Sequence, residues 1–403
     1  MKRALKGLGL GLLLLFSVVL ARAAVSTSLQ PTITPPATLT VDPQSIAHRL
    51  SGAVTFATIA SADPAELAPA PFVAFRAYLA ASWPGAASGL QRELVAEHSL
   101  LYTWKGLDPD LAPILLLAHQ DVVPVSPETL ADWTHAPFAG AVQDGWVWGR
   151  GTMDDKVAVV AILEAVEQLW RTGFRPQRSV ILAFGHDEEV GGTGAAAMAE
   201  LLSRRGVRPL FILDEGLAVT HGLLPGLSQP AALVGLAEKG YLTVELRTQG
   251  AGGHSSMPPD QTAIGVLAAA LTRLEASPMP AHADGPMAEM FRWIAPEMSF
   301  ANRLVFRNRW LFGPLVERIL LSKPTSAATV RTTTAVTMVS GGVKENVLPS
   351  EASATVNFRV FPGETAQDVL RHIEGAVDDP RVRMTIRDGM RSEASPVSRI
   401  DTP

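Results

Sequence analysis

Three continuous apolar runs in the first half of the chain each lead into histidine or acidic residues. Runs of this kind are typical of strands buried on both faces of a parallel sheet. A fourth stretch, 149–153, reaches Asp154 just before a helical pattern over 157–170. Because ligands bind beyond the carboxyl ends of parallel strands, the pattern predicts one site at one sheet edge. The three runs are 114–118, 179–185 and 210–213, followed by His119 with Asp121, by His186 to Glu189, and by Asp214 with Glu215.

The pattern changes after residue 240. Residues 241–248 and 352–360 alternate between apolar and polar side chains, which predicts half-exposed strands. Helical patterns lie at 262–274 and 366–377. Strands and helices in this arrangement predict a small α+β domain, inserted into the α/β domain that precedes it.

The predicted fold class is therefore α/β, with a mixed, mostly parallel sheet covered by helices and an inserted α+β lid or dimerisation domain. We expect the first part of the catalytic domain over 44–236 and the lid over 237–378. Residues 379–403 are expected to return to the catalytic domain.

Residues 277–326 form an apolar insert rich in Met, Phe and Trp. A segment of this length without structure is uncommon in a compact domain, so it should be folded and used. One interpretation is a pair of helices packed on the sheet of the lid. The other is an apolar lining for a hydrophobic substrate.

The first 23 residues have the features of a targeting segment. Lys2, Arg3 and Lys6 precede an apolar run over 8–20, and residues 21–23 supply a small-x-small cleavage pattern. The segment is either a cleaved secretory signal or an uncleaved membrane anchor, so we expect a protein that is exported, to the periplasm or beyond, or held at the membrane. Residues 24–43, rich in Pro and Thr, predict an extended linker.

Composition narrows the chemistry. The net charge is −5 and there is no basic block, which argues against a nucleic-acid partner. The chain has no cysteine, so a metal site must use histidine and carboxylate ligands.

The residues at the strand ends can form such a site. His119 and Asp121 are two positions apart, so on an extended strand end they share one face, and Asp121 can orient the histidine ring. Glu188 and Glu189 point to opposite faces, so one can bind a metal while the other acts on a water molecule. Taken singly, Asp154 could be an ordinary helix cap and the two glutamates a solvated turn. Four such ends in succession favour a divalent cation and a metallohydrolase.

Five motifs in order resemble the di-zinc amidohydrolases, a family that includes acetylornithine deacetylase, succinyl-diaminopimelate desuccinylase, aminoacylase, glutamate carboxypeptidase and carboxypeptidase S. The resemblance extends from about residue 42 to the end. His186 and the apolar insert look most like the branch of carboxypeptidase S and the secreted N-acyl-amino-acid hydrolases. The motifs lie at 119–124, 149–156, 187–192, 214–216 and 252–258.

The resemblance implies a role for each residue. His119 and Asp214 would bind one zinc ion, Glu189 would bind a second, and Asp154 would bridge the two. Glu188 would be the general base that takes a proton from the water between the zinc ions. The reaction implied is hydrolysis of an amide or peptide bond next to an amino-acid carboxylate. The substrate would be a small peptide or an N-acyl amino acid.

The resemblance also implies roles for Asp121 and for the lid. Asp121 would support catalysis by holding His119. His254 would reach the active site of a partner subunit in a homodimer formed through the lid, and Asn346 with Arg359 would bind the substrate carboxylate. The peptide bond after Asp154 is expected to be cis, as in relatives.

One departure from the family concerns its last zinc ligand, a histidine near the C-terminus, for which this sequence has no match. We therefore expect a chain that is shortened at its C-terminus and binds about one zinc ion, where a full-length protein would bind two. The alternative function is a non-catalytic homologue that binds peptide or metal.

Overall fold

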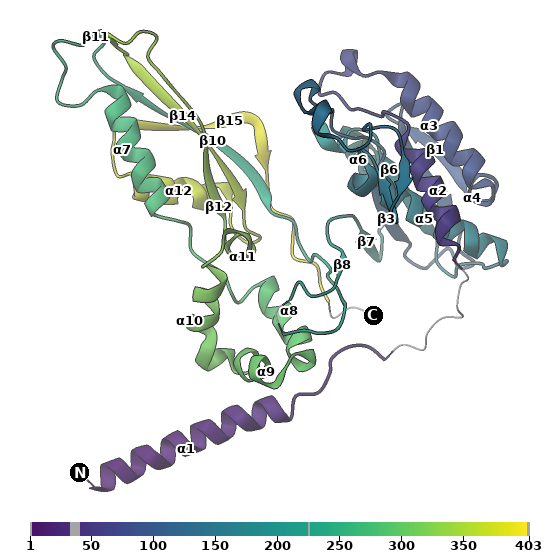
Figure 1. The fold of residues 1–403 in the computed structure, drawn as a ribbon, viewed down its shortest axis with the longest axis horizontal. Coiled ribbons are helices and arrows are strands. Elements are labelled where there is room, and N and C mark those ends of the chain that lie inside the picture. Colours follow the sequence, from purple (N-terminus) through teal and green to yellow (C-terminus); the bar gives the residue numbers. More distant parts are fainter. Residues whose placement is uncertain (1, 33–40, 225, 401–403) are drawn as a thin grey trace. The chain divides into compact units, whose positions relative to one another are not determined.

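Figure 1 shows the computed structural model, which describes residues 2–32, 41–224 and 226–400. The chain divides into two compact units. The first, Ile33–Gly216, is called the α/β unit here, and the second, Met1–Thr32 with Leu217–Pro403, is called the lid unit. Residues 33–40 of the expected linker lie outside the described residues.

The α/β unit is built on a five-stranded sheet in the order β1-β2-β6-β3-β7. The sheet is mixed, as predicted: β1, β2 and β6 are antiparallel to one another in turn, whereas β6, β3 and β7 are parallel. Its main elements are α2 (Pro43–Val54), α3 (Pro69–Ser82), α4 (Pro84–Gly89), β1 (Gln91–Val95), β2 (Ser99–Trp104), β3 (Ile114–His119), β4 (Ala141–Gln143), β5 (Trp146–Trp148), α5 (Val157–Arg171), β6 (Val180–Gly185), α6 (Thr193–Arg204) and β7 (Phe211–Leu213).

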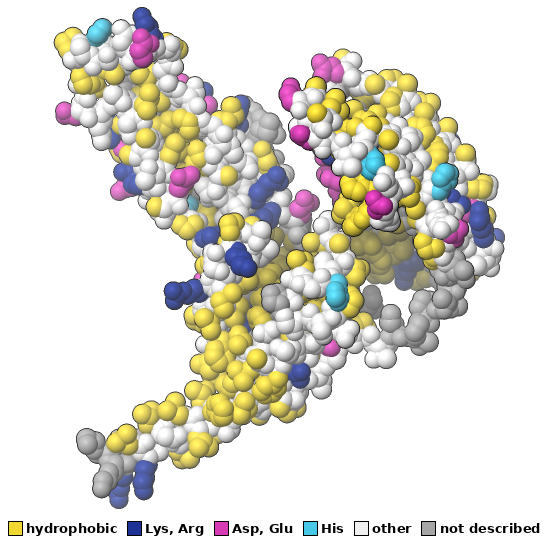
Figure 2. Space-filling model, in the orientation of Figure 1, with side chains coloured by type: hydrophobic (Ala, Val, Ile, Leu, Met, Phe, Trp, Pro, Cys, Tyr) yellow, Lys and Arg dark blue, Asp and Glu magenta, His cyan; other side chains and the backbone are white. Residues whose placement is uncertain are grey.

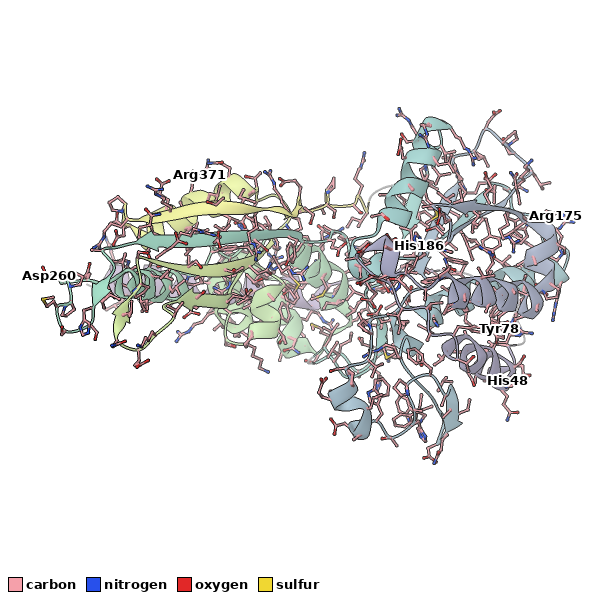
Figure 3. The ribbon with its side chains drawn as sticks, turned by 90° about the horizontal axis from the view of Figure 1, so that it is seen from above. His48, Tyr78, Arg175, His186, Asp260 and Arg371 are labelled. Carbon is pink, nitrogen blue, oxygen red and sulfur yellow. The ribbon has the colours of Figure 1, made fainter. Side chains whose placement is uncertain are left out.

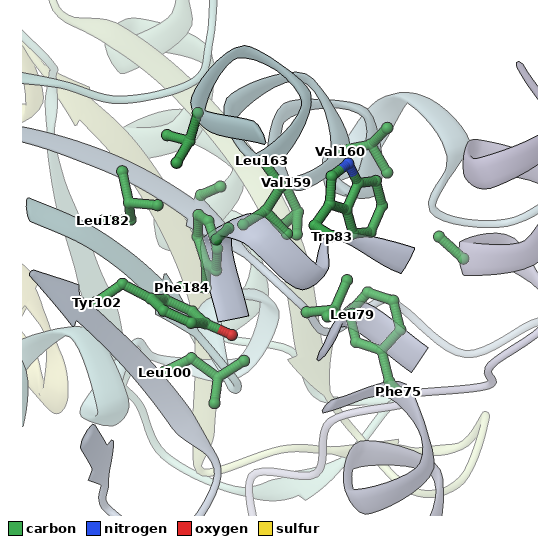
Figure 4. Packing of buried hydrophobic residues seen from close by; sticks show 14 of the residues in the cluster. Phe75, Leu79, Trp83, Leu100, Tyr102, Val159, Val160, Leu163, Leu182 and Phe184 are labelled. Carbon is green, nitrogen blue, oxygen red and sulfur yellow. The ribbon is translucent and has the colours of Figure 1, made fainter. Parts of the chain in front are cut away.

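Side chains of the central strands alternate between two cores, as the two-residue period of a strand requires. Leu100 and Leu182 face a core with Trp83 and helices α2 to α5 (Figure 4). Leu101 and Ile181 face a smaller core under α6. The prediction of a buried strand is wrong for β7, which lies at the sheet edge with its side chains about half exposed.

The lid unit contains a four-stranded antiparallel sheet in the order β12-β14-β10-β15. We had expected residues 379–403 to return to the α/β unit. Residues 382–392 instead pair with β10 at the edge of the lid sheet. The elements are β8 (Val219–Thr220), β9 (Ala231–Ala232), β10 (Gly240–Gln249), β11 (Gly253–His254), α7 (Ala263–Ala276), β12 (Thr333–Gly341), β13 (Val347–Leu348), β14 (Glu351–Val360), α12 (Ala366–Val377) and β15 (Val382–Ser392).

The core of the lid lies between one face of this sheet and helices α7 and α12. Alternate residues of β14, among them Ala354, Val356 and Phe358, are almost fully buried there. Thr365 and Asp368 begin α12 with a reciprocal capping box. One face of the sheet is thus covered by helices, which is common in antiparallel sheets.

The apolar insert is helical. Met279 at its start packs in the core of the lid sheet, but the helices that follow do not join that core, as one of our interpretations required. Phe291, Ile294, Met298 and Val316 form a separate apolar cluster. The insert contains α8 (Pro286–Ile294), α9 (Phe300–Phe306), α10 (Arg309–Leu320) and α11 (Pro324–Ala328).

The N-terminal segment forms α1 (Lys2–Ala24), which belongs to the lid unit. Within the described residues it is the one helix that is long and apolar enough to cross a membrane, over Leu5–Ala24. Its length and apolar composition are those of a secretory signal as well as of a membrane anchor.

Candidate metal centre

His119 is the last residue of β3 and lies at the centre of the candidate site. Its ring is almost completely buried, with 2% of the residue exposed. Nε2 lies 2.9 Å from Asp154 Oδ1 and 3.6 Å from Glu215 Oε1. One ligand atom from each of these three residues lies within 4.8 Å of the other two. One imidazole and two carboxylates in this arrangement are suited to a divalent cation.

Asp121 connects His119 to the acidic turn after β6. Its carboxylate is fully buried and accepts the backbone N–H groups of Glu188 and Glu189, each at 3.1 Å. Oδ1 also lies 3.3 Å from His119 Nδ1, whose other close neighbour is the Asp121 carbonyl oxygen at 3.0 Å. Asp121 therefore fixes both the histidine ring and the turn that carries the two glutamates.

Asp154 lies in a distorted turn immediately before α5, and the peptide bond between Asp154 and Asp155 is cis, as expected. The interpretation of Asp154 as an ordinary helix cap is wrong, because α5 has Lys156 at its N-cap position and no side-chain cap. Gly151 precedes this turn with φ +79°, and a Cβ there would lie 2.3 Å from Val122 Cγ1. Only glycine fits this close approach.

Glu188 and Glu189 lie on a short turn directly after His186, which Figure 3 labels. Asp187 holds the turn by accepting the backbone N–H groups of Thr193 and Gly194 at the start of α6, both at 2.8 Å. Partial burial and neighbouring carboxylates raise the pKa of both glutamates above the usual value, although Glu188 remains open to solvent. A raised pKa suits a carboxylate that accepts a proton near neutral pH.

Glu215 is the residue that the sequence analysis did not assign to the site. We expected Asp214 to bind beside His119, but the structure places the Glu215 carboxylate there. Asp214 instead accepts the backbone N–H of Glu215. Successive side chains beyond a strand end point in different directions, so only one of the pair at 214–215 faces His119.

Several carboxylates act on the charge of His119. Burial lowers the pKa of His119, but its contact with Asp121 and the charges of Asp121, Glu215 and Asp155 outweigh burial and raise the pKa to about 10. Burial, followed by the charge of Glu215, raises the pKa of Asp155 to about 7. A cation that binds His119 at neutral pH must therefore displace a proton.

Lys156 stabilises the turn that carries Asp154, a role that was not predicted from the sequence. It is fully buried, and its Nζ donates to the carbonyl oxygens of Ala53 and Phe56 and lies 4.9 Å from the centre of the Phe75 ring. Burial lowers its pKa to about 7. These contacts attach the turn at Asp154 to the end of α2.

The three predicted substrate-binding residues all belong to the lid unit, but the structure brings only two of them together. His254 on β11 pairs with Val347, next to Asn346, whose carbonyl oxygen accepts the N–H of Ser255. Asn346 lies just before β13, which leads into the start of β14 at Glu351. Arg359 lies near the other end of β14, over the ring of Tyr241. Arg359 is eight residues after Glu351, which is roughly 25 Å along a strand.

Comparison with known proteins shows the family to which this chain belongs. A sequence model described as "Peptidase family M20/M25/M40" matches residues 115–310, and one described as "Peptidase dimerisation domain" matches residues 236–385. The N-fatty-acyl-amino acid synthase/hydrolase PM20D1 of Mus musculus is 41% identical over 361 residues, which cover 88% of this chain and 70% of that protein. The chain belongs to peptidase family M20/M25/M40.

The name of a second relative agrees with the branch that the motifs indicated, and a solved structure shares the fold. The carboxypeptidase S-like 2 protein of Dictyostelium discoideum is 45% identical over 345 residues, which cover 84% of this chain and 66% of that protein. The chain thus spans about two thirds of the length of these relatives. Human carnosine dipeptidase 1 shares the fold, with a TM-score of 0.55 at 15% identity over 92% of this chain and 83% of that one.

Proposed function

We propose that this chain is a metal-dependent hydrolase that cleaves an amide or peptide bond next to an amino-acid carboxylate. The observation that carries the proposal is the group formed by His119, Asp154 and Glu215 at the edge of the sheet. Membership of a peptidase family supports the reaction class. The names of the two relatives, a carboxypeptidase S-like protein and an N-fatty-acyl-amino acid synthase/hydrolase, support either a carboxypeptidase or an N-acyl-amino-acid hydrolase.

The residues fit zinc as the metal. Imidazole and carboxylate donors are zinc ligands, and thiolates are absent from this chain. His119, Asp154 and Glu215 would hold one ion. Asp154 and Glu189 would contribute to a second position, since the charge of Asp154 is close enough to raise the pKa of Glu189.

Zinc at this position supplies Lewis-acid polarisation of the scissile carbonyl and lowers the pKa of a water molecule. Glu188 takes the proton of the attacking water and delivers it to the leaving amine, which its raised pKa favours. Asp121 holds the backbone of Glu188 and the ring of His119, so that the base and the metal ligand keep one geometry.

The lid supplies the substrate contacts in this proposal. His254 and Asn346 would act together, with His254 serving the active site of a partner subunit in a homodimer. Arg359, far from both along the sheet, would bind the substrate carboxylate from another position, since a guanidinium group suits that ligand. The match of residues 236–385 to a dimerisation domain supports the homodimer.

The test is hydrolysis by zinc-loaded protein, with Glu188→Gln as the variant and Glu200→Gln on the exposed face of α6 as the matched control. The Glu188 variant should lose more than about 10²–10⁴-fold in kcat while it keeps its metal, because both proton transfer and water activation are lost. The control should be unchanged. A dipeptide and the N-acetyl, N-octanoyl and N-oleoyl forms of one amino acid identify the preferred substrate. Bound zinc without turnover of any of them would establish the binding-only alternative.

A further inference from the structure

Helix α1 is packed onto the apolar insert by one of its faces. Leu15, Val19 and Ala23 are four residues apart, so they share a face of the helix. Val19 is 4% exposed and Ala23 is fully buried. Helix α9 lies against this part of α1, whereas the leucines from Leu5 to Leu14 are exposed. The last third of α1 is thus part of the lid unit, and the first two thirds have no protein contacts that bury them.

Buried polar groups also tie α1 to the insert. Asn308 is fully buried, and its Nδ2 donates to the carbonyl oxygens of Val19 at 3.0 Å and Leu304 at 2.8 Å. Its Oδ1 accepts from Trp310 Nε1 at 3.3 Å. Removing α1 would deprive this amide of one of its partners inside the protein, which is unfavourable for a buried donor.

A second link lies on the far side of the small-x-small sequence at 21–23. Gln30 Nε2 donates to the Trp293 carbonyl oxygen at 3.1 Å. Cleavage near residue 23 would keep this contact but remove those of Val19 and Ala23. The packing therefore favours a retained helix over a cleaved signal.

The insert exposes an apolar face beside α1. Leu311, Leu315 and Ile319 recur every four residues on α10 and are 39%, 49% and 59% exposed. Trp310 and Phe300 are exposed as well, at 57% and 49%. Figure 2 shows hydrophobic side chains that continue from α1 onto the helices of the insert. An exposed apolar surface of this kind marks an interaction site.

The charge of the insert indicates the partner. Residues 286–328 contain six Arg and Lys against three Glu, although the whole chain has a net charge of −5. A basic, apolar helical surface is attracted to anionic lipid. Two copies of the same surface would bring like charges together, which disfavours a second copy of this chain as the partner.

We propose that α1 is retained, that its N-terminal part inserts into a lipid bilayer, and that the exposed apolar face of α9 and α10 lies on the surface of that bilayer. Residues 5–18, nearly all of them exposed, are about 21 Å long as a helix, so they reach into the hydrocarbon core of about 30 Å without crossing all of it. Because Val19 and Ala23 are packed on α9, the insert is held where α1 leaves the lipid.

The absence of cysteine from the chain makes a site-specific test possible. Full-length Leu315→Cys and Val339→Cys proteins are labelled with an environment-sensitive fluorophore. Val339, on β12 of the same unit, is 64% exposed and serves as the control. Both are reconstituted into vesicles of phosphatidylcholine with phosphatidylglycerol that contain a doxyl-lipid quencher, and the N-terminus is determined by mass spectrometry.

The proposal predicts a blue-shifted label at 315, quenched several times more strongly than the label at 339, on a chain that keeps residues 2–24. A solvent-like label at 315 in the presence of vesicles would overturn the membrane face. If the label at 315 is shielded from water in detergent without vesicles, and the shielding increases with protein concentration, the face would be assigned to contact with a second copy instead. A chain that begins near Ala24 would overturn the retained helix.

Discussion

Replacing Asp121 by asparagine should weaken the fold and the metal site together. The buried carboxylate now accepts two backbone N–H groups, from Glu188 and Glu189. The two N–H groups bond to different carboxylate oxygens, and asparagine replaces one of these oxygens with an NH₂ group, which cannot accept the second N–H. One charge-assisted hydrogen bond is lost and a buried donor is left unpaired. The expected cost is about 3 kcal/mol in the free energy of unfolding.

The effect should depend on pH in the metal-free protein. The pKa of Asp121 is lowered in the folded state, so its contribution is present above about pH 3.9 and is lost as the pH falls through the folded-state value. The pKa of His119 is raised to about 10, in part by Asp121. The stability contributed by the contact between these two side chains is present below about pH 6.5 and is lost as the pH rises through about 10. The difference in unfolding free energy between the wild-type protein and the Asp121→Asn variant should therefore be largest between about pH 4 and 6.5.

The assay is urea unfolding of chelator-treated protein, followed by tryptophan fluorescence. Six of the eight tryptophans lie in the α/β unit, so the signal reports on that unit. Asp108→Asn is the control, because Asp108 accepts a single backbone N–H, that of Asp110. Zinc affinity, measured against a competing chelator, should fall about 10–100-fold in the Asp121 variant alone. A change in unfolding free energy below about 0.5 kcal/mol, the range of ordinary surface substitutions, with unaltered zinc affinity would refute the reasoning.

Three further predictions concern the metal and the subunits. Glu215→Gln should weaken zinc binding more than Asp214→Asn in the same chelator competition, since Glu215 lies beside His119; the reverse order would restore our first assignment. Zinc binding near pH 7.5 should release protons, because the pKa of His119 is raised to about 10, and calorimetry in buffers of different ionisation enthalpy should detect the release; an enthalpy independent of the buffer would exclude it. Mixed dimers of Glu188→Gln and His254→Ala chains should recover part of the activity that each variant lacks, and no recovery after proven subunit exchange would indicate a site formed by one chain.

The sequence was most informative where a local pattern determines the structure. Continuous apolar runs identified β3 and β6, and parallel strands necessarily end at one edge, so His119 could be placed near the residues after β6. The two-residue spacing of His119 and Asp121 predicted their contact in the same way. The resemblance to a known family added the role of each residue in catalysis and in metal binding.

The sequence was less informative where the structure depends on distant contacts. Whether Asp214 or Glu215 reaches His119 depends on how the chain leaves β7, and no local pattern records that direction. Arg359 and His254 both lie on the lid, but only the strand register reveals that they occupy opposite ends of it. The place of residues 382–392 depends on an edge of the lid sheet that was available for pairing. The packing of the insert on α1 likewise joins segments almost 300 residues apart.

The most direct test of the account is the position of zinc in crystals of the zinc-loaded protein, located from anomalous scattering at the zinc edge. The account predicts a peak about 2.0–2.1 Å from His119 Nε2 and within ligand distance of the Asp154 and Glu215 carboxylates. Zinc bound elsewhere in the chain, with the His119 ring still paired to Asp154, would contradict it.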